Sequence, residues 1–350
     1  MTLIGQATAV DGAVLGGPTG SPRTAARPRT RSPWTGFALR RAATLLVSVL
    51  ALVVVTFLIV QLIPGDPAIS IAGPDASPER VAQIRAELGL DLPVWRQFLD
   101  YAAGLLAGDL GDSFSWGVPV STIIANRIPY TLTLALVSMA VVLVVAIPAG
   151  LAVTVLTRGG RRRGLDLAFG AITGLFSAVP GYVTATLLVV VFAIAVPLLP
   201  PAYTAGAGWR GLVLPVVALS LGATCTLARV VRRDSAAALE LDYIRTARGW
   251  RLPAPRIYLR HLLPNVITAT LTLSGLLLSG MFAGAVVVEV VFAWPGLGSA
   301  VVKAIVSRDY PVIQGIVLVV GVLAMLVNLV VDVLLGTIDP RSLKGRHVDV

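Results

Sequence analysis

Between two long apolar stretches the chain reads Asp242-Tyr243-Ile244-Arg245-Thr246-Ala247-Arg248-Gly249-Trp250-Arg251. Pro253, Pro255 and the segment Arg260-His261-Leu262-Leu263-Pro264-Asn265 follow before the next apolar stretch begins. A segment with so many arginines is too costly to leave in hydrocarbon, so it lies outside the bilayer. Loops rich in Lys and Arg stay on the cytoplasmic side of a membrane, which places the loop 232–262 there. The flanking stretches are then membrane spans.

The composition supports this interpretation. Hydrophobic residues make up 56% of the chain and charged residues 13%, about half the charged share of soluble globular domains. The net charge is +10, but the basic residues cluster at span ends and do not form one soluble basic face, so no nucleic-acid partner is expected. The sequence predicts an all-α polytopic membrane protein.

Six apolar stretches are long enough to span a bilayer of about 30 Å. With six spans and two arginines before the first, every basic loop falls on one side, so both termini are predicted to be cytoplasmic. The predicted spans cover about 37–63, 130–156, 165–191, 212–231, 266–292 and 312–335. The corresponding domains are a disordered cytoplasmic extension (1–36), a first transmembrane helix (37–65), an extracytoplasmic insertion (66–129), a core (130–336) and a cytoplasmic tail (337–350).

The insertion is net negative, which suits the outer side. Its acidic residues include Asp66, Asp91, Asp109 and Asp112. Ser77 followed by Pro78 is typical of a helix start, because serine caps free amides and proline is tolerated at the first position. We expect one helix from there to about Leu88 and a second over 94–106.

No catalytic or metal site is evident. Cys225 is the single cysteine, and His261 and His347 are far apart in sequence, so neither a disulfide nor a metal cluster is expected. A phosphate-binding loop of the form Gly-x-x-x-x-Gly-Lys is also missing from the sequence. If the protein moves a solute by ATP hydrolysis, another chain must bind the ATP, and this chain is not itself an enzyme.

An ion-coupled carrier or channel is the alternative, and it needs ionisable residues within the membrane. The candidates are Glu289, near the outer end of the fifth span, and Asp332, near the inner end of the sixth, with Asn328 four residues before it on the same helix face. Pro180 interrupts the third span and marks either a kink or a pathway. These four residues are candidates for gating, and helix packing explains them equally.

The loop 232–262 is the strongest functional lead. We expect Asp242 to cap a short helix, with Tyr243, Thr246 and Ala247 on one face, Arg245 and Arg248 beside it, and Pro253 and Pro255 ending it. Such a helix could dock a cytoplasmic partner, or it could grip anionic lipid headgroups. The residues alone leave both options open.

The chain resembles the integral-membrane permease subunits of bacterial ATP-binding-cassette (ABC) importers, in the dipeptide/oligopeptide/nickel family, and within it the B-type subunit of dipeptide permeases. The resemblance covers about residues 37–341. Besides the segments quoted above, it rests on Ile63-Pro64-Gly65-Asp66-Pro67, Leu88-Gly89-Leu90-Asp91, Gly108-Asp109-Leu110-Gly111-Asp112-Ser113, Arg127-Ile128-Pro129-Tyr130-Thr131-Leu132, Val288-Glu289-Val290-Val291-Phe292-Ala293-Trp294-Pro295-Gly296-Leu297-Gly298 and Arg308-Asp309-Tyr310-Pro311-Val312-Ile313-Gln314-Gly315.

The resemblance implies a type I ABC importer permease fold in which Asp242–Arg251 is the coupling helix that seats in an ATPase subunit. Arg245, Thr246 and Ala247 correspond to the family's Glu-Ala-Ala positions. Trp250 stands where a lysine is usual, and Arg251 stands at the motif glycine.

The resemblance also implies partners and a location. The partners would be a second, homologous permease forming a heterodimer, one or two ATP-binding subunits carrying ATP and Mg, membrane lipid, and an extracytoplasmic binding protein received near the acidic insertion. The protein would lie in the bacterial cytoplasmic membrane. Short peptides are the expected cargo, and nickel chelates, glutathione and heme are alternatives within the family.

Overall fold

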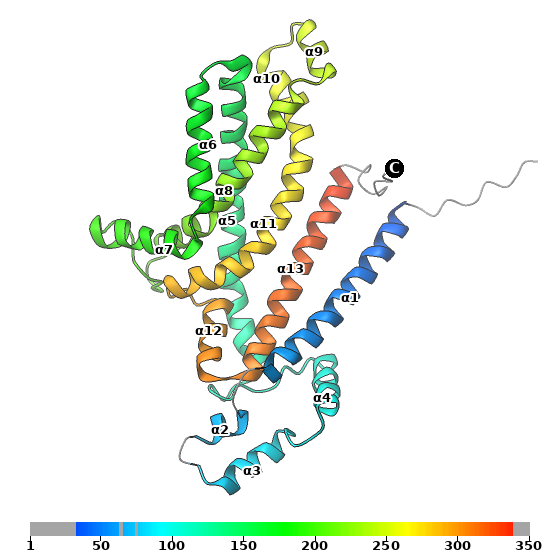
Figure 1. Cartoon of the computed structure of the whole chain (residues 1–350), viewed down its shortest axis with the longest axis vertical. Coiled ribbons are helices and arrows are strands. Elements are labelled where there is room, and N and C mark those ends of the chain that lie inside the picture. Colours follow the sequence, from blue (N-terminus) through cyan, green and yellow to red (C-terminus); the bar gives the residue numbers. More distant parts are fainter. Residues whose placement is uncertain (1–32, 63–65, 74–75, 339–350) are drawn as a thin grey trace, which may run out of the picture.

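The computed structural model describes residues 33–62, 66–73 and 76–338. Its long helices run roughly parallel, with the short helices of the insertion at one end and α9 at the other (Figure 1). We call these the insertion end and the α9 end. Long apolar segments form helices because a bilayer offers no partner for backbone N–H and C=O groups. The long helices are α1 (Pro33–Leu62), α5 (Val120–Leu156), α8 (Arg210–Ala238), α11 (Leu263–Val291) and α13 (Tyr310–Ile338).

Five of the predicted spans are confirmed as single helices long and apolar enough to cross a membrane. Several boundaries were wrong. α5 begins ten residues before residue 130, α8 continues past Arg232 to Ala238, and helical structure leads into α11 from Ala254 onward. α1 begins at Pro33, so residues 33–36 are helical and not part of a disordered extension. The rest of that predicted extension, and the tail beyond Ile338, lie outside the described residues.

The third predicted span is not one straight helix. α6 (Arg163–Ala178) ends just before Pro180, and α7 (Gly181–Val189) follows at an angle of 96° to it. α7 then continues into a π-helical segment, Val190–Ala195. Proline cannot donate the backbone hydrogen bond that would continue α6, and it disfavours helix at the residue before it. Figure 1 shows α7 running across the other helices. Pro180 therefore marks a sharp break.

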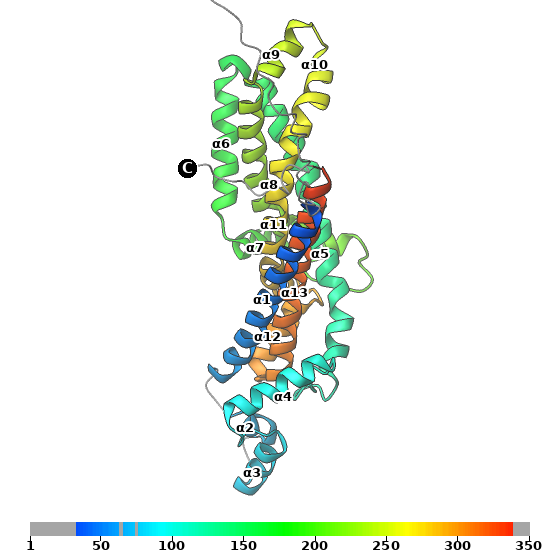
Figure 2. The same cartoon turned by 90° about the vertical axis from the view of Figure 1, so that its right-hand side faces the viewer.

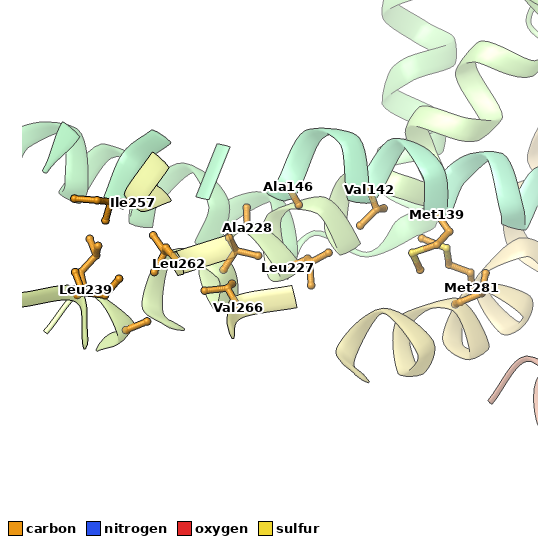
Figure 3. Close-up of a cluster of buried hydrophobic side chains, with 14 of the residues drawn as sticks. Met139, Val142, Ala146, Leu227, Ala228, Leu239, Ile257, Leu262, Val266 and Met281 are labelled. Atoms are coloured by element: carbon orange, nitrogen blue, oxygen red, sulfur yellow. The ribbon is translucent and has the colours of Figure 1, made fainter. Parts of the chain in front are cut away.

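The core lies where α5, α8 and α11 meet. Gly150 lets the backbones of α5 and α8 approach closely, since a Cβ at Gly150 would lie 2.7 Å from the carbonyl oxygen of Ala228 in α8. Small residues at such crossings are typical of membrane helix packing. Figure 3 shows buried side chains running between these helices, among them Met139, Ala146, Leu227 and Met281.

α6 is fastened alongside α8 by polar contacts. Arg232 donates to Asp166 at 2.5 Å, and Arg229 donates to Ser177 at 2.8 Å. α1 lies beside α13 away from this core (Figures 1 and 2). The side chains of α1 are largely exposed, Leu46 and Val47 among them, as expected for surfaces that meet lipid or another membrane subunit.

The insertion is helical, as predicted. Its elements are α2 (Pro67–Ala72), α3 (Pro78–Glu87) and α4 (Val94–Leu106). Ser77 caps α3 by accepting a hydrogen bond from the Arg80 amide at 3.3 Å, which confirms the predicted start. α4 has the predicted bounds. Outside the insertion, the connection between α11 and α13 contains a short apolar helix, α12 (Leu297–Ser307).

Candidate functional site: the α9 helix and the α11–α12 corner

α9 (Asp242–Gly249) is a separate short helix at the end of α8. It ends in a left-handed turn, with Arg251 at φ 54°. The Arg251 amide donates to the Arg248 carbonyl at 2.8 Å, and the Leu252 amide donates to the Ala247 carbonyl at 3.3 Å. This pattern is the usual helix stop that glycine favours, because glycine has no Cβ to clash at positive φ. Arg251 adopts the conformation that the motif glycine would adopt.

One face of α9 is held in the core. Ile244 is fully buried and Ala247 is 4% exposed, and both join the cluster formed with α5, α8 and the π-helical segment η3 (Ile257–Leu262). The sequence placed Tyr243, Thr246 and Ala247 on one face of the helix, and this was wrong for Ala247. Ala247 points into the chain itself, because the short alanine fits where α9 lies against its own support.

The opposite face of α9 is open. Thr246 and Arg245 are exposed, and Tyr243 and Trp250 are 42% and 76% exposed. Positions three and four residues apart lie on the same side of a helix, so Tyr243, Thr246 and Trp250 form one surface. We call these three residues the α9 face. Exposed aromatic side chains on so short a helix and at its C-cap, Trp250, are typical of a protein–protein contact.

Asp242 does not cap α9, contrary to prediction. Leu241 takes the cap position, and Asp242 is the first helical residue, with its carboxylate exposed and 3.5 Å from Arg245. A carboxylate in the first turn still interacts favourably with the helix dipole. Arg248 is half-buried and donates to the Leu239 carbonyl at 3.3 Å. Burial, and then the nearby Arg158, lower the pKa of Arg248 from its ordinary value.

Glu289 lies at the insertion end of α11 and is fully buried. Its carboxyl oxygens accept hydrogen bonds from the Thr131 hydroxyl of α5 at 2.7 Å and from the Ser299 amide of α12 at 3.0 Å. Thr131 in turn accepts from the Leu297 amide at 2.9 Å. Gly296 passes against this carboxyl group, where a Cβ would collide with it. Glu289 thus joins three helices, and we call this arrangement the Glu289 corner.

Aromatic rings close the same corner. The Trp294 indole donates to the Tyr130 carbonyl at 3.1 Å. Its ring packs edge-on against Tyr203 at 5.0 Å between centroids and against Tyr130 at 6.0 Å. Edge-to-face aromatic pairs add to the stability gained from burial. Of the two roles open for Glu289, its contacts match helix packing.

Comparison with known proteins identifies the family. Residues 146–344 match the family described as binding-protein-dependent transport system inner membrane component. Residues 35–135 match the N-terminal region described for the membrane components of the same transport systems. The chain belongs to this family. It is the permease subunit of an ABC importer of the peptide group, and a multi-pass inner-membrane protein, as the sequence predicted.

Relatives match most of the chain and nearly all of their own length. A "Putative peptide transport system permease protein" of Brucella suis is 38% identical over 88% of this chain and 98% of its own length. A "Glutathione transport system permease protein" of Salmonella typhimurium is 38% identical over 87% of this chain and 97% of its own. A chain of the methionine ABC transporter MetNI, solved in an inward-facing conformation, has a TM-score of 0.53 and 19% identity, covering 63% of this chain and 97% of that one. That likeness confirms the type I permease fold.

Asp332 of the permease forms an ion pair with Arg41 of α1. Asn328, one helical turn before it, is half-buried. The pairing of Asp332 with a neighbouring helix is the packing interpretation left open by the sequence. The Arg41–Asp332 ion pair also joins α1 to α13 near the ends of these helices that lie on the α9 side.

The four acidic residues predicted to face a binding protein have different surroundings. Asp66 caps α2 through the Ala68 amide at 2.9 Å and pairs with Arg85 of α3. Asp109 accepts from the Gly111 amide at 2.8 Å within its own turn. Asp91 and Asp112 are exposed. The Arg85 guanidinium, as a hydrogen-bond donor, holds the pKa of Asp66 below its ordinary value. Asp66 therefore stabilises the insertion.

Asp309 was not singled out from the sequence. It is fully buried before α13 and accepts hydrogen bonds from the Ser113 hydroxyl at 2.5 Å, the Ser115 amide at 3.0 Å and the Phe114 amide at 3.2 Å. It thereby ties the insertion to the last span across 196 positions. The signal available in the sequence was an aspartate directly before Tyr310-Pro311, where a helix begins.

Proposed function

We propose that this permease forms one half of the pore of an ATP-driven importer, with a second, homologous permease as the other half. ATP and Mg would bind one or two separate ATPase subunits docked on the α9 face. A binding protein would deliver the solute at the insertion end. The proposed orientation puts α9 and both termini in the cytoplasm, since the arginine-rich segments lie at the α9 end.

The α9 face is the observation that carries this proposal. A helix whose inner side chains, Ile244 and Ala247, are buried in the core moves with that core as a rigid body. Its outer side chains, Tyr243, Thr246 and Trp250, remain available to a partner. When ATP closes the ATPases, motion of α9 would rock the attached spans and switch the pore between inward-open and outward-open states, as in hinge and shear transitions of packed helices.

Short peptides are the proposed cargo. Two relatives, each about as long as this chain, are named for peptide and for glutathione transport, and glutathione is itself a small peptide. Nickel chelates and heme are the remaining alternatives from the family resemblance. The test is uptake of a labelled dipeptide and of labelled glutathione by cells with and without the gene. Gene-dependent dipeptide uptake is expected, and uptake of glutathione alone would reassign the cargo.

The docking role is tested by Trp250→Ala in the assembled complex. An exposed tryptophan at an interface commonly contributes about 2 kcal/mol or more, so retention of the ATPase subunit should fall by about thirtyfold. Trp209→Ala is the matched control, because Trp209 is 72% exposed but lies at the opposite end of α8. Ala247 is unsuitable for this test, because a larger side chain there would disturb the core.

Three results bear on the proposal. Loss of the ATPase subunit and of uptake in Trp250→Ala alone supports docking at the α9 face. Full ATPase retention in Trp250→Ala contradicts it. Purification of the permease without any ATPase subunit, with ion-dependent uptake, would favour the ion-coupled alternative.

The orientation is tested with single cysteines at exposed positions of the two ends. Ala86 lies on α3 of the insertion, and Ala237 lies near the α9-side end of α8. A membrane-impermeant maleimide should label Ala86→Cys in intact cells and Ala237→Cys only after the membrane is opened. Labelling of both variants in intact cells would overturn the orientation.

A further inference from the structure

A pocket of about 290 Å³ lies at the α9 end, beneath α9 itself. Its walls come from three parts of the chain: Thr157 and Arg158 at the end of α5, Arg232 of α8, and Arg248 of α9. We call it the arginine pocket. It is distinct from the α9 face, because Arg248 lies beside the buried side of α9 and donates to the chain's own Leu239 carbonyl.

The arginine pocket has more positive than negative charge. Three arginines line it, and Glu240 is the one carboxylate among its lining residues. Arg232 pairs with Asp166 from α6. Among the residues that the structure describes, neither Arg158 nor Arg248 takes part in an ion pair.

Two further observations show that these arginines would gain from an anionic ligand. The Nε of Arg232 is buried and has no hydrogen-bond acceptor within the described residues, and a buried donor without a partner is costly. Arg158 and Arg248 line the same pocket, and burial and the charge of Arg158 lower the pKa of Arg248. An anion between them would remove both costs.

We propose that the arginine pocket binds a phosphate group. Guanidinium groups present planar pairs of donors that match phosphate oxygens, and they do so better than ammonium groups. The volume admits a phosphate together with several waters, since each water in the liquid takes about 30 Å³. The phosphate would come from the headgroup of an anionic lipid in the leaflet on the α9 side, or from free phosphate in solution.

A bound phosphate would have a structural consequence. Arg158, Arg232 and Arg248 belong to the α5–α6 turn, to α8 and to α9. One anion contacting all three would fasten α9 to the two helices at the centre of the core. The proposal therefore adds a ligand that stiffens α9, and its test does not depend on transport or on the identity of the cargo.

The first arm of the test measures lipid. The whole complex is extracted from membranes containing phosphatidylglycerol and phosphatidylethanolamine, and bound lipid is counted by native mass spectrometry. We expect phosphatidylglycerol to remain on the wild type and its affinity to fall about fivefold for each guanidinium removed in Arg158→Gln and Arg248→Gln. Arg233→Gln is the matched control, because Arg233 follows Arg232 on α8 but its side chain is 78% exposed and lies outside the pocket.

The second arm measures free phosphate. The delipidated complex is titrated with sodium phosphate or with sodium chloride of equal ionic strength, and the thermal unfolding midpoint is recorded. Stabilisation that phosphate alone gives, and that the two glutamine variants lose, identifies free phosphate as a ligand. The pair Arg158→Lys and Arg248→Lys keeps the charge and guards against misfolding, and it should bind more weakly than wild type because lysine lacks the paired donors.

The outcomes separate the sources. Arginine-dependent retention of phosphatidylglycerol assigns the pocket to a lipid headgroup, and arginine-dependent stabilisation by phosphate without lipid retention assigns it to the free ion. If neither depends on Arg158 or Arg248 in folded complexes, the proposal is wrong. The same holds if the glutamine variants only lose the ATPase subunit, because the arginines would then serve that partner.

Discussion

Glu289 offers the sharpest test of how the permease holds its insertion end together. The change is Glu289→Ala. The residue is fully buried, and its carboxyl oxygens are the acceptors for the Thr131 hydroxyl and the Ser299 amide. Alanine removes both acceptors at a position with no exposed surface. A buried donor left without a partner costs about 1–3 kcal/mol, so the two together should lower the free energy of unfolding by about 2–6 kcal/mol.

Glu289→Gln should have an intermediate effect, because the amide keeps one acceptor oxygen and presents an NH₂ group to the other donor. Its cost should be close to that of one lost hydrogen bond, about 1–3 kcal/mol. Comparing the two variants separates loss of the carboxyl group's contacts from loss of its bulk. Glu87→Ala is the control, because Glu87 is exposed on α3 and surface substitutions usually change stability by under about 0.5 kcal/mol.

The assay uses a residue that the chain already has. Cys225 is the single cysteine and is buried in α8, so a thiol-reactive fluorogenic dye reports unfolding on heating in detergent. At roughly 1.4 °C per kcal/mol for a chain of 350 residues, the alanine variant should melt about 3–8 °C below wild type. A midpoint for Glu289→Ala within about 1 °C of wild type would refute the assignment of Glu289 as the residue that joins α5, α11 and α12.

Three other predictions concern separate contacts. Gly150→Ala should cost about 1–3 kcal/mol in the same melting assay, because its Cβ would meet the α8 backbone, whereas Gly170→Ala on α6, where nothing lies within 4 Å, should not destabilise the protein. The Asp66–Arg85 contact should stabilise the insertion above the ordinary aspartate pKa of about 3.9 and lose that contribution as the pH falls through the lowered folded value. Hydrogen-exchange protection over α2–α3, corrected for the intrinsic exchange rate at each pH, should therefore fall below about pH 4 in wild type and lack this step in Asp66→Asn. Asp309→Ala should release the loop before α5, since two amides and a hydroxyl lose their acceptor, and faster exchange confined to that loop and the start of α13 is the expected signature.

The sequence predicted the spans well because the bilayer imposes a strong rule on composition. A helix that crosses hydrocarbon must be apolar along its length, so α1, α8 and α13 could be located from hydropathy alone. Their ends were harder, because the rule stops at the membrane surface. α5 begins ten residues earlier, at Val120 toward the insertion end, and runs on through Pro129. α8 continues past Arg232 to Ala238. The third span needs a separate explanation, because it is a bent pair of helices that can still form one span. Hydropathy cannot distinguish a spanning helix from a bent pair, and only Pro180 indicated the break.

Side-chain direction on α9 shows most clearly what could not be deduced from the sequence. A helix of eight residues beginning at Asp242 has two candidate faces, one with Ile244 and Ala247 and one with Tyr243 and Thr246. Both faces carry an apolar residue, so periodicity does not say which one the protein covers. The answer depends on η3 and the end of α8, which pack against the smaller, more aliphatic side. Tyr243 and Trp250 lie away from that support and are exposed, which makes them the aromatic surface proposed to receive a partner.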